Sequence, residues 1–223
     1  MKPAENDQNP YLRDPDVRLM LRAKAGDQAA FSQLVANYQD RLVGVLAHLV
    51  QSREWAEDLA QEVFLRIYRA RHGYEPTARF STWLFQIANN LARNLRRDTG
   101  RRREVGMVAD ESGSSGLRPG SAAIPDKSGL MPTRVSESTE MCSIVQAALD
   151  TLTDSQRMAV LLHRFDEMSY TDIAAALEMS PSAVKSLLSR ARESLREKLE
   201  PYVQRGMLGR IDTSARNQAL TPA

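Results

Sequence analysis

Small and basic hydrogen-bond donors gather on one segment near the C-terminal end of the chain. If residues 181–198 form a helix, most of these donors lie roughly opposite an apolar stripe that includes Val184, Leu188 and Ala191, and Lys185 flanks it, because successive residues turn by about 100°. Hydroxyl, ammonium and guanidinium groups can donate to base edges in a DNA major groove. The expected DNA-binding residues of this segment are Ser182, Lys185, Ser186, Ser189, Arg190 and Arg192.

A second donor surface is expected on a helix from Thr82 to Arg97. Its amides and guanidinium groups can hydrogen-bond bases, and its arginines can pair with phosphates. Aromatic residues beside arginines can also stack on exposed bases, although we expect at least two of Phe80, Trp83 and Phe85 to be core residues. The candidates are Arg79, Trp83, Gln86, Asn89, Asn90, Arg93, Asn94 and Arg97.

A third polar group has no obvious chemistry by itself. Asp58, Gln61, Glu62 and Arg66 lie within two turns of one expected helix, at i, i+3 and i+4 spacing. Such a group is most simply a solvated helix face, so it indicates a binding surface only in combination with other features.

Two capped helices with a short turn between them position the first donor group. Ser169 can cap a helix through Leu177, and Asp172 would complete a capping box. Ser180 can cap the next helix, with Pro181 at its first position, where a missing N–H costs nothing. This arrangement predicts a helix-turn-helix, whose second helix enters the major groove. Thr153 and Gln156 form a further capping box for a supporting helix that ends near Phe165.

Helical periodicity fills two blocks of the chain and fails between them. The pattern begins at Asp14–Pro15, where a helix-start signal stands, and a Gly26–Asp27 pair ends one helix and caps the next. Ser81 is the expected cap of the arginine-rich helix. Residues 99–138 are rich in glycine, serine and proline and cannot bury enough apolar surface to fold alone.

The sequence therefore predicts an all-α fold of two small helical domains joined by a flexible linker. The expected divisions are a disordered N-terminus (1–13), a first domain (14–98), the linker (99–138), a second domain with the helix-turn-helix (139–205) and a disordered tail (206–223).

Composition excludes several classes of protein. The net charge of the 223 residues is only +2, but seven arginines and a single acid, Asp98, lie between Arg79 and Arg103, which favours a polyanionic partner. One cysteine, Cys142, forms no internal disulfide, and the three histidines lack metal-ligand spacing. We expect no cofactor, no metal and no catalytic residue. No apolar run is long enough to span a membrane and no signal peptide is present, which predicts a cytoplasmic protein.

Four motifs in a fixed order resemble a known family. They are Gly26-Asp-Gln-Ala-Ala-Phe31, Asp58-Leu-Ala-Gln-Glu-Val-Phe64, Phe80-Ser-Thr-Trp-Leu-Phe-Gln-Ile-Ala88 and the helix-turn-helix that ends Ser189-Arg-Ala-Arg-Glu193. Together they resemble the extracytoplasmic-function (ECF) group of bacterial sigma factors, within the sigma-70 family. The resemblance covers about residues 14–97 and 143–198.

The resemblance implies a role for each polar group. Asp58, Gln61 and Glu62, with Arg66 beside them, would contact the clamp helices of the polymerase β′ subunit. The loop from Tyr74 to Phe80 and the following helix would melt and read the minus-ten promoter element. The recognition helix would read the minus-thirty-five element, and its domain would touch the β flap. The family often has an anti-sigma partner.

Two other classes of function explain the sequence less fully. A stand-alone helix-turn-helix regulator would explain the C-terminal domain but leaves Asp58–Glu62 and the arginine-rich helix without a role. An enzyme acting on nucleic acid would need clustered carboxylates, histidines or metal ligands, whereas the carboxylates here are scattered.

Overall fold

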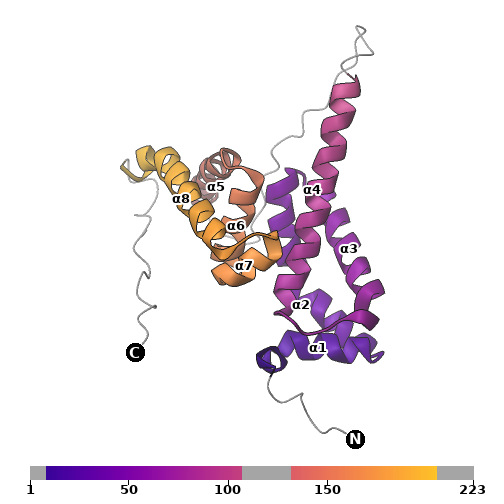
Figure 1. Ribbon diagram of the computed structural model, residues 1–223. Coiled ribbons are helices and arrows are strands. Elements are labelled where there is room, and N and C mark those ends of the chain that lie inside the picture. The colour runs from indigo at the N-terminus through magenta and orange to yellow at the C-terminus, as the bar shows by residue number, and fades with distance from the viewer. Residues whose placement is uncertain (1–8, 107–131, 205–223) are drawn as a thin grey trace, which may run out of the picture.

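The computed structural model describes residues 9–106 and 132–204, and the regular elements in these two stretches are all helices (Figure 1). The N-terminal domain contains η1 (Pro10–Arg13), α1 (Pro15–Lys24), α2 (Gln28–Val50), α3 (Arg53–Ala70), η2 (Arg71–Gly73) and α4 (Phe80–Gly106). The C-terminal domain contains α5 (Pro132–Asp150), α6 (Asp154–Phe165), α7 (Tyr170–Leu177) and α8 (Pro181–Gln204). The all-α prediction is confirmed for the described residues.

Side-chain caps start the first helices where the sequence predicted. The Asp14 carboxylate accepts from the backbone N–H groups of Asp16 and Val17 and begins α1. Asp27 accepts from the Ala30 N–H and begins α2, while Gly26 takes the left-handed φ of +102° that the turn between the two helices requires.

Side-chain caps also begin α6, α7 and α8 in the C-terminal domain. Thr153 and Gln156 form the expected reciprocal capping box. Ser169 accepts from the Asp172 N–H, but Asp172 turns its carboxylate to the Ser169 hydroxyl, 2.6 Å away, so the expected box becomes a side chain–side chain bond. Ser180 accepts from the Ala183 N–H and starts α8 with Pro181 in its first turn.

The expected linker is shorter than its composition suggested. α4 continues to Gly106 and α5 begins at Pro132, so residues 99–106 and 132–138 are helical, while 107–131 and the tail 206–223 lie outside the described residues. Arginine propagates a helix well, and proline is favoured at a helix start, so local propensity outweighed the glycine and serine content at both ends. α4 also begins at Phe80, which places Ser81 inside the first turn instead of at the cap.

Residues 9–13 differ from the disordered N-terminus that we expected. They form η1, capped by Asn9, whose Nδ2 also donates to the Pro76 carbonyl oxygen at 2.8 Å. Tyr11 and Leu12 pack against the core, which provides the apolar contact that holds so short a segment in place.

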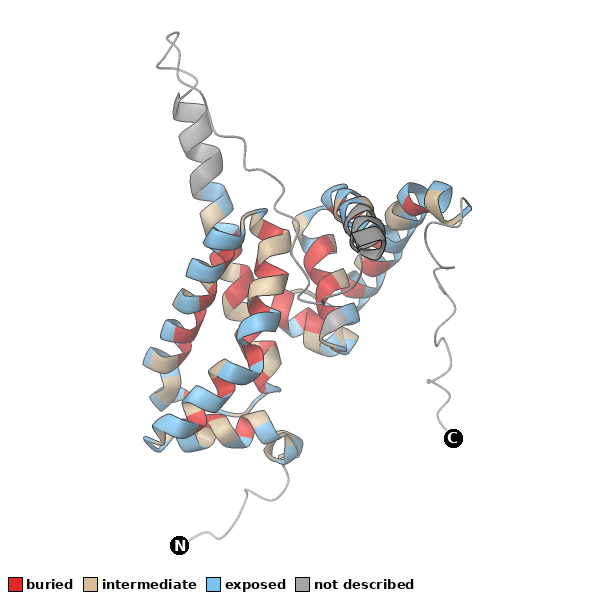
Figure 2. Ribbon diagram, turned by 180° about the vertical axis from the view of Figure 1, so that it is seen from behind, coloured by how far each residue is buried: buried red, intermediate tan, exposed pale blue. Residues whose placement is uncertain are grey.

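The two domains share one hydrophobic core. α7 packs on α4, and α6 packs on α2. The continuous cluster of buried residues includes Leu42, Phe80, Leu84 and Phe85 of the N-terminal domain together with Met158, Leu162 and Ile173 of the C-terminal domain. Figure 2 shows buried residues, coloured red, along the sides of the helices that face one another. The sequence predicted two separate domains, and the structure adds that they are packed together.

Candidate nucleic-acid interfaces

The recognition helix α8 presents its donors to solvent. Val184, Leu188 and Ala191 are buried, whereas all six predicted DNA-binding residues are exposed. Within α8, the Ser186 hydroxyl donates to the Ser182 carbonyl oxygen at 3.1 Å, and Arg190 Nε donates to the Ser186 carbonyl oxygen at 3.4 Å. Arg192 instead bonds another helix, donating to the Tyr170 hydroxyl of α7 at 3.3 Å. The open face is made up of the other five residues: Ser182, Lys185, Ser186, Ser189 and Arg190.

The α4 surface is less uniform than its sequence pattern suggested. Arg79, Arg93, Asn94 and Arg97 are exposed. Trp83, Gln86 and Asn90 are half-buried, and Asn89 is only 7% exposed. Asn89 follows Phe85 by one turn and precedes Ala92 by another, and both neighbours are buried, so it lies on the side of α4 that faces the core. The expectation that Asn89 widens the exposed polar face is wrong.

The half-buried amides of α4 already have partners in the C-terminal domain. Gln86 Nε2 and Asn90 Nδ2 both donate to Glu178 Oε1, at 3.1 and 3.2 Å. These hydrogen bonds hold the pKa of Glu178 below its usual range. One turn earlier, the Thr82 hydroxyl donates to Asp172 Oδ1 at 3.3 Å. Thr82, Gln86 and Asn90 form one stripe of α4, and this stripe is covered.

A hollow of about 480 Å³ lies beside this stripe. The loop from Gly73 to Ala78 lines one part of it, and Thr82, Trp83, Gln86 and Ala175 line the rest. The rings of Tyr74 and Trp83 lie 5.0 Å apart. Phe80 and Phe85 are fully buried, which confirms that at least two of Phe80, Trp83 and Phe85 belong to the core. Burial raises the pKa of Tyr74 to about 12, and its hydroxyl has no hydrogen-bond partner among the described residues.

The polar group of α3 is accessible. Asp58, Gln61 and Arg66 are exposed and Glu62 is half-buried. Arg66 Nε donates to Glu62 Oε1 at 2.7 Å, and this bond lowers the pKa of Glu62. Two large apolar side chains of this region, Trp55 and Leu65, are 44% and 48% exposed, although neither was among the predicted site residues. Trp55 lies three residues before Asp58, and Leu65 lies three residues after Glu62. An exposed apolar side chain therefore lies at each end of the polar group.

Two further features were looked for in the described ranges: a metal-binding cluster and a membrane-spanning helix. Residues 9–106 and 132–204 contain no cluster of three or more histidine, cysteine, aspartate or glutamate side chains that could hold a metal. Within the same ranges no helix combines the length and apolar character needed to cross a lipid bilayer.

Two family matches define the class of protein. Residues 34–102 match the family described as sigma-70 region 2, and residues 142–195 match sigma-70 region 4. The first match contains the α3 and α4 surfaces, and the second contains the helix-turn-helix. The chain is therefore an RNA polymerase sigma factor built from these two regions.

Similar proteins identify the group. The RNA polymerase sigma-H factor of Pseudomonas aeruginosa is 32% identical over 192 residues, covering 86% of this chain and 97% of that protein. The ECF RNA polymerase sigma-E factor of Escherichia coli K12 is 33% identical over 193 residues, covering 85% and 97%. The chain belongs to the ECF group of the sigma-70 family. Because both relatives match across both domains, a stand-alone regulator is no longer needed to explain the helix-turn-helix.

Solved structures agree with this fold. The sigma factor RpoE of Bartonella quintana, solved with the anti-sigma factor NepR, is 25% identical with a TM-score of 0.59, covering 76% of this chain and 96% of that one. CnrH, solved with the cytosolic domain of CnrY, has a TM-score of 0.61 at 24% identity, covering 84% and 99%.

Proposed function

We propose that this sigma factor directs core RNA polymerase to promoters through three separate surfaces. The α3 group of Asp58, Gln61, Glu62 and Arg66 binds the β′ clamp helices. The α4 face and the loop before it bind the minus-ten element, and α8 binds the minus-thirty-five element while its domain meets the β flap. The subunit has no catalytic activity of its own, needs no cofactor and acts with polymerase in the cytoplasm.

The exposed donor face of α8 is the observation that carries the proposal. Its hydroxyl, ammonium and guanidinium groups lie on the N-terminal half of the helix, which is the part that a recognition helix offers to base edges. Arg190 is the best candidate to read guanine, because a guanidinium can donate to both guanine acceptors in the groove.

The α3 and α4 surfaces support the other two assignments. On α3, two exposed apolar residues flank exposed polar ones, a combination that suits a partner protein better than a purely solvated face does. The exposed Arg93 and Arg97 of α4, and Arg79 just before it, can neutralise phosphates, and the hollow beside Trp83 has an aromatic wall on which an unstacked base could lie.

An anti-sigma factor is the further protein partner that we infer. The similar sigma factor RpoE was solved with such an inhibitor, NepR. Two properties together would identify an anti-sigma factor for this chain. The inhibitor would bind the isolated chain, and it would suppress the transcription that this sigma factor directs.

Transcription in vitro with purified core polymerase and a promoter library tests the proposal. We expect the chain to select promoters that share a minus-ten and a minus-thirty-five sequence, whereas core polymerase alone should select none. Specific binding of the isolated chain to duplex DNA, with no effect on transcription by core polymerase, would instead indicate a stand-alone regulator.

A further inference from the structure

Two side chains from the start of the chain hold the loop between η2 and α4. This loop, residues 74–79, lines the hollow of about 480 Å³ and crosses α1 on its way to α4 (Figure 1). Lys24, in the last turn of α1, donates from Nζ to the carbonyl oxygen of Tyr74 at 2.7 Å. Asn9, which caps η1, donates from Nδ2 to the carbonyl oxygen of Pro76 at 2.8 Å. Two carbonyl groups of the loop are thus bonded to donors that lie 50 and 67 residues earlier in the chain.

The two bonded residues lie on the inner side of the loop. Tyr74 is buried and Pro76 is half-buried, whereas Glu75 and Thr77 between and after them are exposed. Holding Tyr74 and Pro76 against the N-terminal segment therefore keeps Glu75 and Thr77 on the outer side, where both line the hollow. It also keeps the Tyr74 ring 5.0 Å from the ring of Trp83. The shape of the hollow and the polar groups at its edge both depend on how the loop is held.

The loop has little structure of its own to hold this shape. Regular structure ends at Gly73 and resumes at Phe80, and between them the Thr77 N–H donates to the Glu75 carbonyl oxygen at 2.9 Å, which closes a turn of only three residues. A loop that becomes ordered only on binding loses conformational entropy at that moment, and a flexible loop can adapt to several ligands. A loop that is ordered beforehand favours the ligand that fits it. Donors outside the loop should therefore sharpen its selectivity.

We infer that Asn9 and Lys24 are positioning residues for minus-ten recognition, because they hold the loop of residues 74–79 in the shape that discriminates between minus-ten sequences. Each acts through a backbone carbonyl group of the loop and needs no contact with DNA. Both donors and both acceptors belong to the N-terminal domain, so the two hydrogen bonds do not depend on the C-terminal domain. The inference rests on the proposed function, since it assumes that the loop and α4 bind the minus-ten element.

Three variants separate the two hydrogen bonds from other roles of these residues. Asn9→Asp keeps an oxygen that can accept from the Tyr11 N–H, 3.0 Å away, so η1 should stay capped, but it replaces the Nδ2 donor to Pro76 with an acceptor. Lys24→Met removes the other donor and keeps much of the apolar stem. Lys24→Arg restores a charged donor at the same position and should recover the function that Lys24→Met loses.

Two matched controls change the charge of the same domain without touching the loop. Gln39→Glu adds a negative charge as Asn9→Asp does, at an exposed position of α2. Arg18→Met removes a positive charge from α1 as Lys24→Met does, and Arg18 is exposed. Both controls should select minus-ten sequences as wild type does.

Holoenzymes made with each full-length variant would transcribe two promoter libraries, one randomised in the minus-ten element and one in the minus-thirty-five element. The measured quantity is the transcription from the sequences that wild type prefers, divided by the library mean. We expect Asn9→Asp and Lys24→Met each to lower this ratio for the minus-ten library roughly three- to tenfold, as the loss of one hydrogen bond would, and to leave the minus-thirty-five ratio unchanged. A substitution that only destabilised the protein would lower transcription from all promoters by one factor and would not change either ratio.

The outcomes distinguish this inference from the proposed function. An unchanged minus-ten ratio in Asn9→Asp or in Lys24→Met would overturn the positioning role of that residue and leave the proposed function standing. A failure of Lys24→Arg to recover the ratio would show that the bond to Tyr74 is not what Lys24 supplies. If the wild-type holoenzyme preferred no minus-ten sequence at all, the proposed function would fail, and the inference with it.

Discussion

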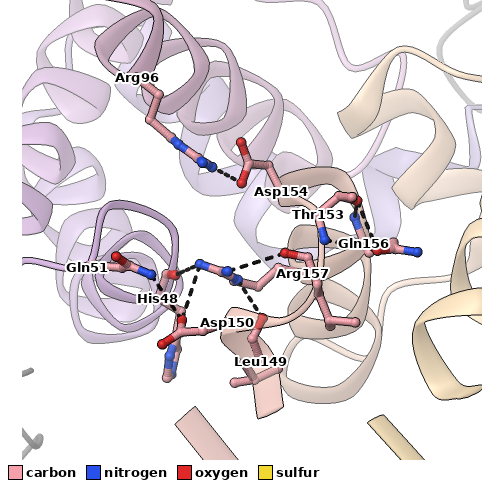
Figure 3. A network of polar contacts seen from close by, with 10 residues as sticks. His48, Gln51, Arg96, Leu149, Asp150, Thr153, Asp154, Gln156 and Arg157 are labelled. Atoms are coloured by element: carbon pink, nitrogen blue, oxygen red, sulfur yellow. Dashed lines mark hydrogen bonds and ion pairs between the residues drawn. The ribbon is translucent and has the colours of Figure 1, made fainter. Parts of the chain in front are cut away.

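Arg157 of α6 donates a hydrogen bond from Nη1 to the backbone carbonyl oxygen of His48, 2.8 Å away and 109 residues earlier in the chain. His48 lies in the last turn of α2, where carbonyl groups have no partner within the helix. The same guanidinium donates to the carbonyl oxygens of Leu149 and Leu152, at 2.9 and 3.3 Å. One buried side chain therefore donates hydrogen bonds at the C-terminal ends of two helices, α2 and α5, and joins the two domains (Figure 3).

Replacing Arg157 should lower the stability of the folded protein. Arg157→Met keeps much of the apolar stem but leaves three carbonyl groups without their donor, so we expect the free energy of unfolding to fall by about 3 kcal/mol. Arg164→Met is the control, because Arg164 is exposed on the same helix and should change stability by less than about 0.5 kcal/mol. Urea unfolding of both variants gives the comparison, and similar midpoints would show that the Arg157 bonds contribute little.

Charge reversal on α3 should abolish binding to core polymerase. Asp58→Lys with Glu62→Lys removes two carboxylates and sets a lysine beside Arg66, yet both positions are accessible and the fold should survive. Co-purification with core polymerase is the measurement, and circular dichroism checks the fold.

The matched control for this pair is Asp40→Lys with Glu57→Lys. Glu57 pairs with Arg53 at 2.8 Å, much as Glu62 pairs with Arg66 at 2.7 Å, but it lies about 100° round the helix from Asp58. We expect this control to co-purify as wild type does. A folded Asp58 and Glu62 double variant that still bound normally would remove α3 from the polymerase interface.

Substitutions in the two DNA-binding surfaces should impair the recognition of different promoter elements. Arg190→Ala should cost roughly 1–3 kcal/mol and relax discrimination at one minus-thirty-five position, because Arg190 lies on the open face of α8. Arg93→Ala should impair minus-ten recognition or opening without changing minus-thirty-five preference. Holoenzymes carrying each variant would be assayed on promoters randomised in each element. A uniform loss across all promoters with Arg190→Ala would make Arg190 a phosphate contact and leave base reading to Lys185, Ser186 or Ser189.

Stability should fall in mildly acidic solution because of His48. Burial between the domains is the main reason that the pKa of His48 lies below its usual value of 6.5, and a hydrogen bond with Gln146 opposes it only in part. The unfolded chain therefore takes up a proton at higher pH than the folded chain does. The contribution is fully present above about pH 6.5 and is lost as the pH falls through the depressed pKa of the folded protein.

Unfolding free energies at pH 7.5 and 5.5 test this dependence. His48→Asn should reduce the difference between the two pH values, whereas His72→Asn should leave it unchanged, because His72 is exposed. If His48→Asn behaved as wild type does, another group would control the dependence.

Two tyrosines should respond oppositely to the same substitution. The Tyr74 hydroxyl is buried with no partner among the described residues, so Tyr74→Phe should raise the free energy of unfolding by up to about 1 kcal/mol. The Tyr38 hydroxyl donates to Asp16 at 2.7 Å, so Tyr38→Phe should lower it by about 1 kcal/mol. Denaturant unfolding measures both, and a loss of stability in Tyr74→Phe would mean that its hydroxyl is satisfied in solution.

The amino-acid sequence by itself determined the helices and most of the candidate surfaces. Caps such as Asp27, Thr153 and Ser180 act on N–H groups three residues away, and the buried and exposed sides of α8 follow from a turn of about 100° per residue. These relationships are local, so spacing alone was enough to predict them. Family resemblance then assigned a role to Asp58, Gln61 and Glu62, whose spacing alone indicated nothing.

The tertiary structure alone decided which of those surfaces are open. Asn89 is buried because two neighbouring turns of α4 face the core, and Trp55 and Leu65 are exposed because the described fold places no partner over them. The bonds from Asn90 to Glu178 and from Arg41 to Asp166 join residues 88 and 125 positions apart. No periodic pattern encodes such pairs, since they depend on how two separately patterned domains fit their apolar faces together.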